Sequence, residues 1–165
     1  MKKIGALDVS VAVLAGISCL GIYLSIPVWA IFIGWAWYFT LGATPDLIKK
    51  SVLPMITGSV LAVIAFLLIG LFSGFMPSMA ATMLAVFITV FALMLSLKVP
   101  VLNISLASFN AYSCIFVGYS AGTYLPIAGM PALLNAAIWV TGANFIGVLF
   151  GWLSIKCTTL KSAKN

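Results

Sequence analysis

The sequence has little charge, and most of that charge is positive. Only 6% of its 165 residues are charged, against about 25% in an average soluble domain. Lysines and two aspartates supply this charge, because histidine, arginine and glutamate are all absent. Apolar residues make up 64% of the chain. This balance excludes a water-soluble globular protein and leaves few groups for acid-base catalysis.

The absent residue types also exclude several kinds of site. Without arginine the chain cannot bind phosphate in bidentate fashion, and we expect no nucleic-acid partner. Cys19, Cys114 and Cys157 are odd in number and show no CxxC spacing. They predict neither disulfides nor a metal site. The sequence therefore implies no metal and no cofactor.

One short motif points to an enzyme. Residues 118–122 match the GxSxG nucleophile pattern of serine hydrolases. A serine nucleophile needs a general base, and the only carboxylates, Asp8 and Asp46, are expected on the opposite side of the membrane from Ser120. We interpret the match as coincidence and predict that the protein is not an enzyme.

Long apolar runs occupy most of the chain. A helix needs about 20 residues to cross the hydrocarbon core of a bilayer. The runs predict an all-α polytopic membrane protein, one membrane domain over residues 1–165, with six transmembrane helices at 7–24, 28–43, 52–72, 79–97, 101–121 and 131–155. The second run is short and the fifth is rich in Asn and Ser, so each is compatible with a continuous or a broken helix.

The lysines alternate between the connections of these six spans. Cytoplasmic segments retain lysine during insertion, and every second connection is basic, whereas the other connections carry no charge. Both termini are therefore expected in the cytoplasm. The lysines that define this pattern are Lys2, Lys3, Lys49, Lys50, Lys98, Lys156, Lys161 and Lys164.

An internal repeat relates the two halves of the chain. Residues 7–72 align without gaps with residues 84–149 at a fixed offset of 77. Each half holds three spans, so the second must enter the membrane from the opposite side, and the sequence predicts a 3+3 inverted repeat. A shared apolar composition is the alternative explanation. Matched pairs include Phe32 with Phe109, Phe39 with Phe116, Pro54 with Pro131 and Gly70 with Gly147.

Polar side chains inside the membrane are concentrated in the fifth and sixth spans. At 100° per residue they form two opposite stripes on the fifth span, which therefore faces protein or water on both sides. Asn103, Asn110 and Cys114 lie on one stripe, and Ser105, Ser108, Tyr112 and Tyr119 lie on the other. One interpretation is that these groups bond neighbouring helices. The other is a solute path lined by Asn103, Ser108, Asn110, Tyr112, Thr141 and Asn144.

Aromatic residues of the second and fifth spans correspond through the repeat. Phe32 and Phe39 match Phe109 and Phe116, and these two pairs predict an aromatic constriction of a shared path. Such a wall suits small neutral solutes, because a hydrophobic constriction resists hydrated ions. Anchoring of aromatic side chains at the membrane interface is the alternative.

These features favour a passive channel or facilitator for a small neutral or weakly basic polar solute. No acidic or histidine side chain is expected deep in the membrane to carry a coupling proton. The alternative is a non-transporting scaffold or accessory subunit whose small-residue faces dock a partner protein. The expected partners are the lipid bilayer, the solute and further copies of the chain.

Residues 26–39, with the later stretch 102–118, resemble a family of small bacterial inner-membrane proteins, domain of unknown function 1097. The likeness includes a Trp-x-x-Phe-x-Gly-x-x-x-Tyr-Phe pattern, from Trp29 to Phe39, and covers nearly the whole chain. Where the family's later helix carries a Pro-Gly pair, this chain has Leu106 and Ala107, which argues against a broken fifth helix. The resemblance implies a location in the bacterial cytoplasmic membrane and no assigned activity.

Overall fold

The computed structural model describes the backbone of residues 4–162 and the side chains of residues 4–158. Within these limits every regular element is a helix, and η denotes a 3-10 helix. The order is α1 (Ala6–Ser18), η1 (Cys19–Leu24), α2 (Val28–Thr40), α3 (Pro45–Phe72), α4 (Ser78–Ser96), η2 (Pro100–Leu102), α5 (Ser105–Ala121) and α6 (Ala132–Ser162).

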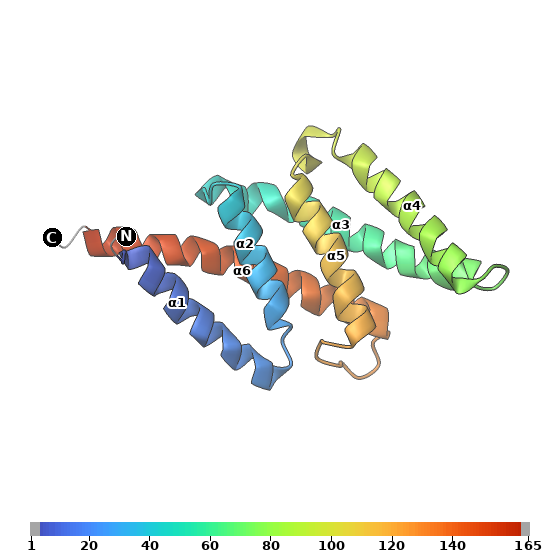
Figure 1. Cartoon of the computed structure of the whole chain (residues 1–165), viewed down its shortest axis with the longest axis horizontal. Helices are drawn as coiled ribbons and strands as arrows, with labels where there is room; N and C mark the ends of the chain where they lie inside the picture. Colours follow the sequence, from blue (N-terminus) through green and yellow to red (C-terminus); the bar gives the residue numbers. More distant parts are fainter. Residues whose placement is uncertain (1–3, 163–165) are drawn as a thin grey trace.

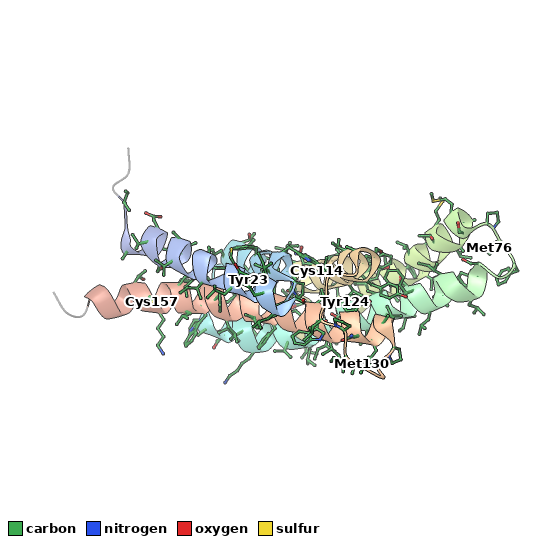
Figure 2. The ribbon with its side chains drawn as sticks, turned by 90° about the horizontal axis from the view of Figure 1, so that it is seen from below. Tyr23, Met76, Cys114, Tyr124, Met130 and Cys157 are labelled. Carbon is green, nitrogen blue, oxygen red and sulfur yellow. The ribbon has the colours of Figure 1, made fainter. Side chains whose placement is uncertain are left out.

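The helices form two layers. Figure 2 shows α3 and α6 on one side of the molecule and the other four α-helices on the opposite side. The short helices α2 and α5 lie at the centre, where α2 packs on α6 and α5 packs on α3 (Figure 1). Towards the two ends of the molecule, α1 packs on α6 and α4 packs on α3.

The predicted all-helical fold is confirmed. Four segments are long and apolar enough to cross a membrane: Ala6–Leu24, Pro45–Phe72, Ser78–Ser96 and Ala132–Thr158. The other two helices are short, since α2 has 13 residues and α5 has 17, or about 20 and 26 Å at 1.5 Å per residue. Four such helices are compatible with an α-helical membrane protein, whereas the count of six spans stays a prediction.

The local signals for helix starts act as expected for two helices. Thr44 precedes α3 with extended backbone angles, and Pro45 occupies its first turn. Asp46 lies in the same turn and its Oδ2 is 4.0 Å from Nζ of Lys50. In α1 the Gly5 N–H donates to Asp8 Oδ2 at 2.7 Å. Both carboxylates therefore serve helix ends.

Glycines allow the central helices to touch through their backbones. A Cβ on Gly58 of α3 would collide with the backbone oxygen of Ser108 in α5, and one on Gly147 of α6 would collide with that of Ile31 in α2. Gly34 of α2 meets the backbone oxygen of Asn144 in the same way. The small residues therefore set the separation of each helix pair.

The burial patterns of α2 and α3 reappear in α5 and α6. The buried positions of α3 reappear in α6 at an offset of 89, which places Gly58 on Gly147. Those of α2, apart from Val28, reappear in α5 at an offset of 77. The α3 set is Leu47, Ser51, Pro54, Met55, Gly58, Ser59, Ala62 and Ala65, and the matching α6 set is Ala136, Val140, Ala143, Asn144, Gly147, Val148, Gly151 and Ser154. Helix α6 has one further buried residue, Asn135, whose counterpart Asp46 is exposed.

Burial in α3 and α6 does not follow the predicted offset of 77. Pro54 lies inside α3, whereas Pro131 precedes α6. Gly70 has open space around it, whereas Gly147 is packed against α2. The larger offset agrees with the element lengths, because the connection 122–131 is longer than the connection 41–44 and α5 is longer than α2.

The connections that carry lysine lie on one side of the molecule. The start of α1, the α2–α3 turn, the α4–α5 connection and the end of α6 follow the upper left edge of Figure 1. The other three connections follow the lower right edge. Lys2, Lys3 and Lys164 lie outside the described residues, as does the side chain of Lys161.

Candidate functional site

The predicted lining residue Asn144 is part of a bond network inside the protein. Its side chain is fully buried. Its Oδ1 accepts a hydrogen bond from Trp37 Nε1 at 3.1 Å, and its Nδ2 donates to Cys114 Sγ at 3.4 Å. Asn144 thereby connects α6 to α2 and to α5, and within one chain its amide faces protein.

Tyr112 and Ser108 also point into the packed interior. The Tyr112 hydroxyl is 2.8 Å from Thr89 Oγ1 of α4, and either oxygen can donate. Ser108 is fully buried, and its hydroxyl donates to the backbone oxygens of Ser105 and Ile104 at 3.1 and 3.3 Å. These two hydroxyls bond within the protein.

The two asparagines predicted to share a stripe with Cys114 are separated. Helix α5 begins at Ser105, so Asn103 lies before it, at the end of η2, and does not share its face. The prediction of one helical stripe is wrong at this residue because Pro100 starts a separate 3-10 turn. Asn110 is half-buried and its Nδ2 donates to the Leu106 backbone oxygen at 2.7 Å.

The aromatic residues predicted to form a constriction lie in separate groups. Phe32 and Phe39 flank Trp35 on α2, with ring centroids 6.4 and 6.3 Å from it. Phe116 lies 4.4 Å from Phe66 of α3, centroid to centroid. Phe109 packs on the same apolar cluster as Phe116. In the described part of the chain, no ring pair joins the α2 phenylalanines to those of α5.

The remaining predicted lining residue, Thr141, opens onto a groove between α3 and α6. Its Oγ1 is 2.7 Å from Oγ of Ser59, and either oxygen can donate. This groove has a volume of about 380 Å³ and is lined only by residues of these two helices. The lining comprises Val52, Met55, Ile56, Ser59, Val60, Ala137, Ile138, Thr141, Gly142 and Phe145.

Two pairs of groove residues correspond between α3 and α6. At the offset of 89, Val52 corresponds to Thr141 and Ile56 to Phe145, and all four line the groove. Its two bonded hydroxyls come one from each half, and no charged residue lines it. The arrangement can hold a small uncharged molecule by apolar contact and one or two hydrogen bonds.

Sequence reasoning missed Ser59, which is buried in a helix that otherwise reads as an apolar span. Gly58 and Ala62 are small residues on the same stretch of the sequence, and such residues are a signal for a close helix contact. The partner of Ser59 across the groove is Thr141, and neither repeat offset reveals it, because the offset of 77 pairs Ser59 with Ala136 and the offset of 89 pairs it with Val148.

The other candidate chemistries gain no support from the geometry. Ser120 is exposed in the last turn of α5. Within the described residues, no group of three or more His, Cys, Asp or Glu side chains could hold a metal ion. Of the cysteines, Cys114 is buried while Cys19 and Cys157 are exposed, and all three are free.

Comparison with known proteins places the chain in a family without assigning it an activity. No curated protein and no solved structure matches it. One family of proteins of unknown function, DUF1097, matches residues 8–159, which is nearly the whole chain. The match agrees with the resemblance carried by the aromatic pattern of residues 26–39. The chain belongs to the DUF1097 family.

Proposed function

We propose that the protein is a passive facilitator in the bacterial cytoplasmic membrane, which passes small uncharged polar solutes along the groove between α3 and α6. The observation that carries this proposal is the pair of bonded hydroxyls, Ser59 and Thr141, which the two halves of the chain contribute to one groove. Inverted repeats commonly enclose their substrate site at the interface between the halves.

The proposal includes six membrane spans arranged as two inverted halves. The coincident burial patterns of α2 with α5 and α3 with α6 support it, as do the matching contacts of α1 with α6 and α4 with α3. The lysine-bearing connections on one side support a cytoplasmic position for the start of α1 and the end of α6.

The proposal also requires a second copy of the chain. The groove is lined by α3 and α6 alone, and its lining residues Ile56, Val60 and Ile138 are exposed in the single chain. A neighbouring copy that covers it would separate the solute from lipid. The uncharged, mainly apolar lining favours solutes such as urea, glycerol or acetamide over hydrated ions.

The test is solute-driven swelling of vesicles that contain the full-length protein. Gly142 lines the groove, and a Cβ added to it would meet no heavy atom within 4 Å, so Gly142→Phe should fill the groove without displacing the core. We expect it to lower solute flux at least about tenfold, since a blocked path leaves only leakage. Gly70→Phe is the matched control, because Gly70 is equally open and lies outside the groove.

Two results contradict the proposal. Unchanged flux in a folded Gly142→Phe protein removes the groove as the path. No flux above that of protein-free vesicles, for any of the three solutes, removes transport altogether.

The second candidate is a membrane scaffold that docks another protein. It is favoured by the internal hydrogen bonds of Asn144 and Tyr112, which show two predicted lining groups serving helix contacts. A protein that carries no solute but co-purifies in fixed stoichiometry with one membrane partner would support this candidate.

A further inference from the structure

A second groove lies on the lysine-bearing side of the molecule. It has a volume of about 460 Å³ and lies between the start of α3 and the α4–α5 connection. We propose that it binds the headgroup of an anionic glycerophospholipid from the adjoining leaflet. Its lining comprises Lys49, Lys50, Leu53, Pro100, Val101, Asn103 and Ile104.

The charge of the groove fits a phosphodiester. Lys49 and Lys50 are both exposed at its edge. The nearby acidic group is Asp46, whose Oδ2 lies 4.0 Å from Lys50 Nζ with both side chains largely in solvent. Such an exposed pair is weak, so a phosphate can compete for Lys50. The two lysines and the one carboxylate carry one net positive charge. This charge can balance the single negative charge of the lipid headgroup.

Asn103 adds a neutral hydrogen-bonding group to the same groove. It is exposed at the end of η2, and its amide makes no hydrogen bond within the described part of the chain. The amide can both donate and accept. It therefore suits a headgroup that carries a phosphate together with hydroxyl groups, such as phosphatidylglycerol.

The apolar part of the lining favours a lipid over a free phosphate ion. Leu53 and Val101 are 52% and 62% exposed, and both face this groove. Inorganic phosphate gains nothing from these side chains, whereas an acyl chain covers them. A groove with cations at its edge and apolar walls is typical of lipid headgroup sites between membrane helices.

The test is thermal stabilisation of the full-length protein in neutral detergent by dioctanoyl-phosphatidylglycerol. Dioctanoyl-phosphatidylcholine and inorganic phosphate serve as the comparison ligands. In the double variant Lys49→Gln/Lys50→Gln we expect the apparent Kd to rise about fivefold for each lysine removed. The control Lys156→Gln/Lys161→Gln changes the net charge equally on α6 and should leave the Kd unchanged.

A second variant makes the opposite prediction. Asp46→Asn removes the carboxylate beside Lys50 and should lower the Kd for phosphatidylglycerol, since both lysines then face only the lipid phosphate. The proposal fails if the Lys49→Gln/Lys50→Gln protein binds phosphatidylglycerol like the native chain, or if the control loses binding equally. It also fails if phosphatidylcholine or inorganic phosphate stabilises the protein as strongly as phosphatidylglycerol does.

Discussion

Single glycines determine how closely the central helices approach. Gly58 and Gly147 each lie against a backbone oxygen of the neighbouring helix, in pairs that correspond between the halves. Ser108 and Ile31, which supply those oxygens, are each the fourth residue of their helix. Both halves therefore have a glycine, which has no side chain, at the point where the two helices cross.

The first prediction concerns Gly58→Ala. The new methyl group must push α5 away from α3, so we expect it to destabilise the protein by about 1–3 kcal/mol. Gly70→Ala, in the same helix, adds its methyl group in open space and should be neutral or stabilise by up to about 1 kcal/mol. Thermal unfolding in detergent measures both. Equal melting temperatures for the two variants would show that the α3–α5 contact tolerates separation.

At the scale of whole helices, the buried Asn144 couples three elements. Its amide joins α6 to Trp37 of α2 and to Cys114 of α5, whereas the amide of Asn110 bonds the backbone of its own helix. Two asparagines of one chain, both expected to line a path, thus differ in what they connect. This difference depends on which helices pack together, and helical periodicity alone cannot predict that packing.

The second prediction compares these two asparagines. Asn144→Leu removes both interhelical bonds, each worth about 0.6 kcal/mol in membrane proteins, and leaves Trp37 Nε1 without its partner. We expect a melting temperature lower by several degrees. Asn110→Leu should change it by less than about 2 °C, because it breaks only a bond within one turn. A protein whose stability responds equally to both changes would contradict the bridging role of Asn144.

The sequence predicted the positions of the helices better than it predicted which helices pack together. Apolar runs and proline positions located all six helices, and the offset of 77 matched α2 to α5 because both begin at corresponding residues, Val28 and Ser105. Helices α3 and α6 match at a different offset, 89. Identical residues do not reveal this offset, because the two helices share the positions of their buried residues and, apart from Gly58 and Gly147, not the residue types. The groove between α3 and α6 depends on which faces of these helices pack together, and the apolar run of α3 does not reveal that contact, so Ser59 was missed.

At the scale of the molecule, the arrangement of lysines yields a prediction about orientation. We expect Cys157 to be in the cytoplasm and the connection 122–131 to be outside. In a Cys19→Ser/Cys114→Ser background, a membrane-impermeant maleimide should label Cys157 only after the membrane is opened. In the same background with Cys157→Ser, Ala128→Cys should be labelled in intact cells, because Ala128 is exposed in that connection. The reverse pattern would invert the proposed topology.

The unequal helix lengths have a mechanical consequence. The apolar parts of α3 and α6, residues 51–72 and 132–155, contain 22 and 24 residues, or about 33 and 36 Å, against about 30 Å of hydrocarbon. Such helices fit a bilayer by tilting, and their tilt changes with bilayer thickness. The short helices α2 and α5 pack against them at glycine contacts. In the proposed six-span arrangement we therefore expect acyl-chain length to change the tilt of α3 and α6 and, with it, the angle between the two halves.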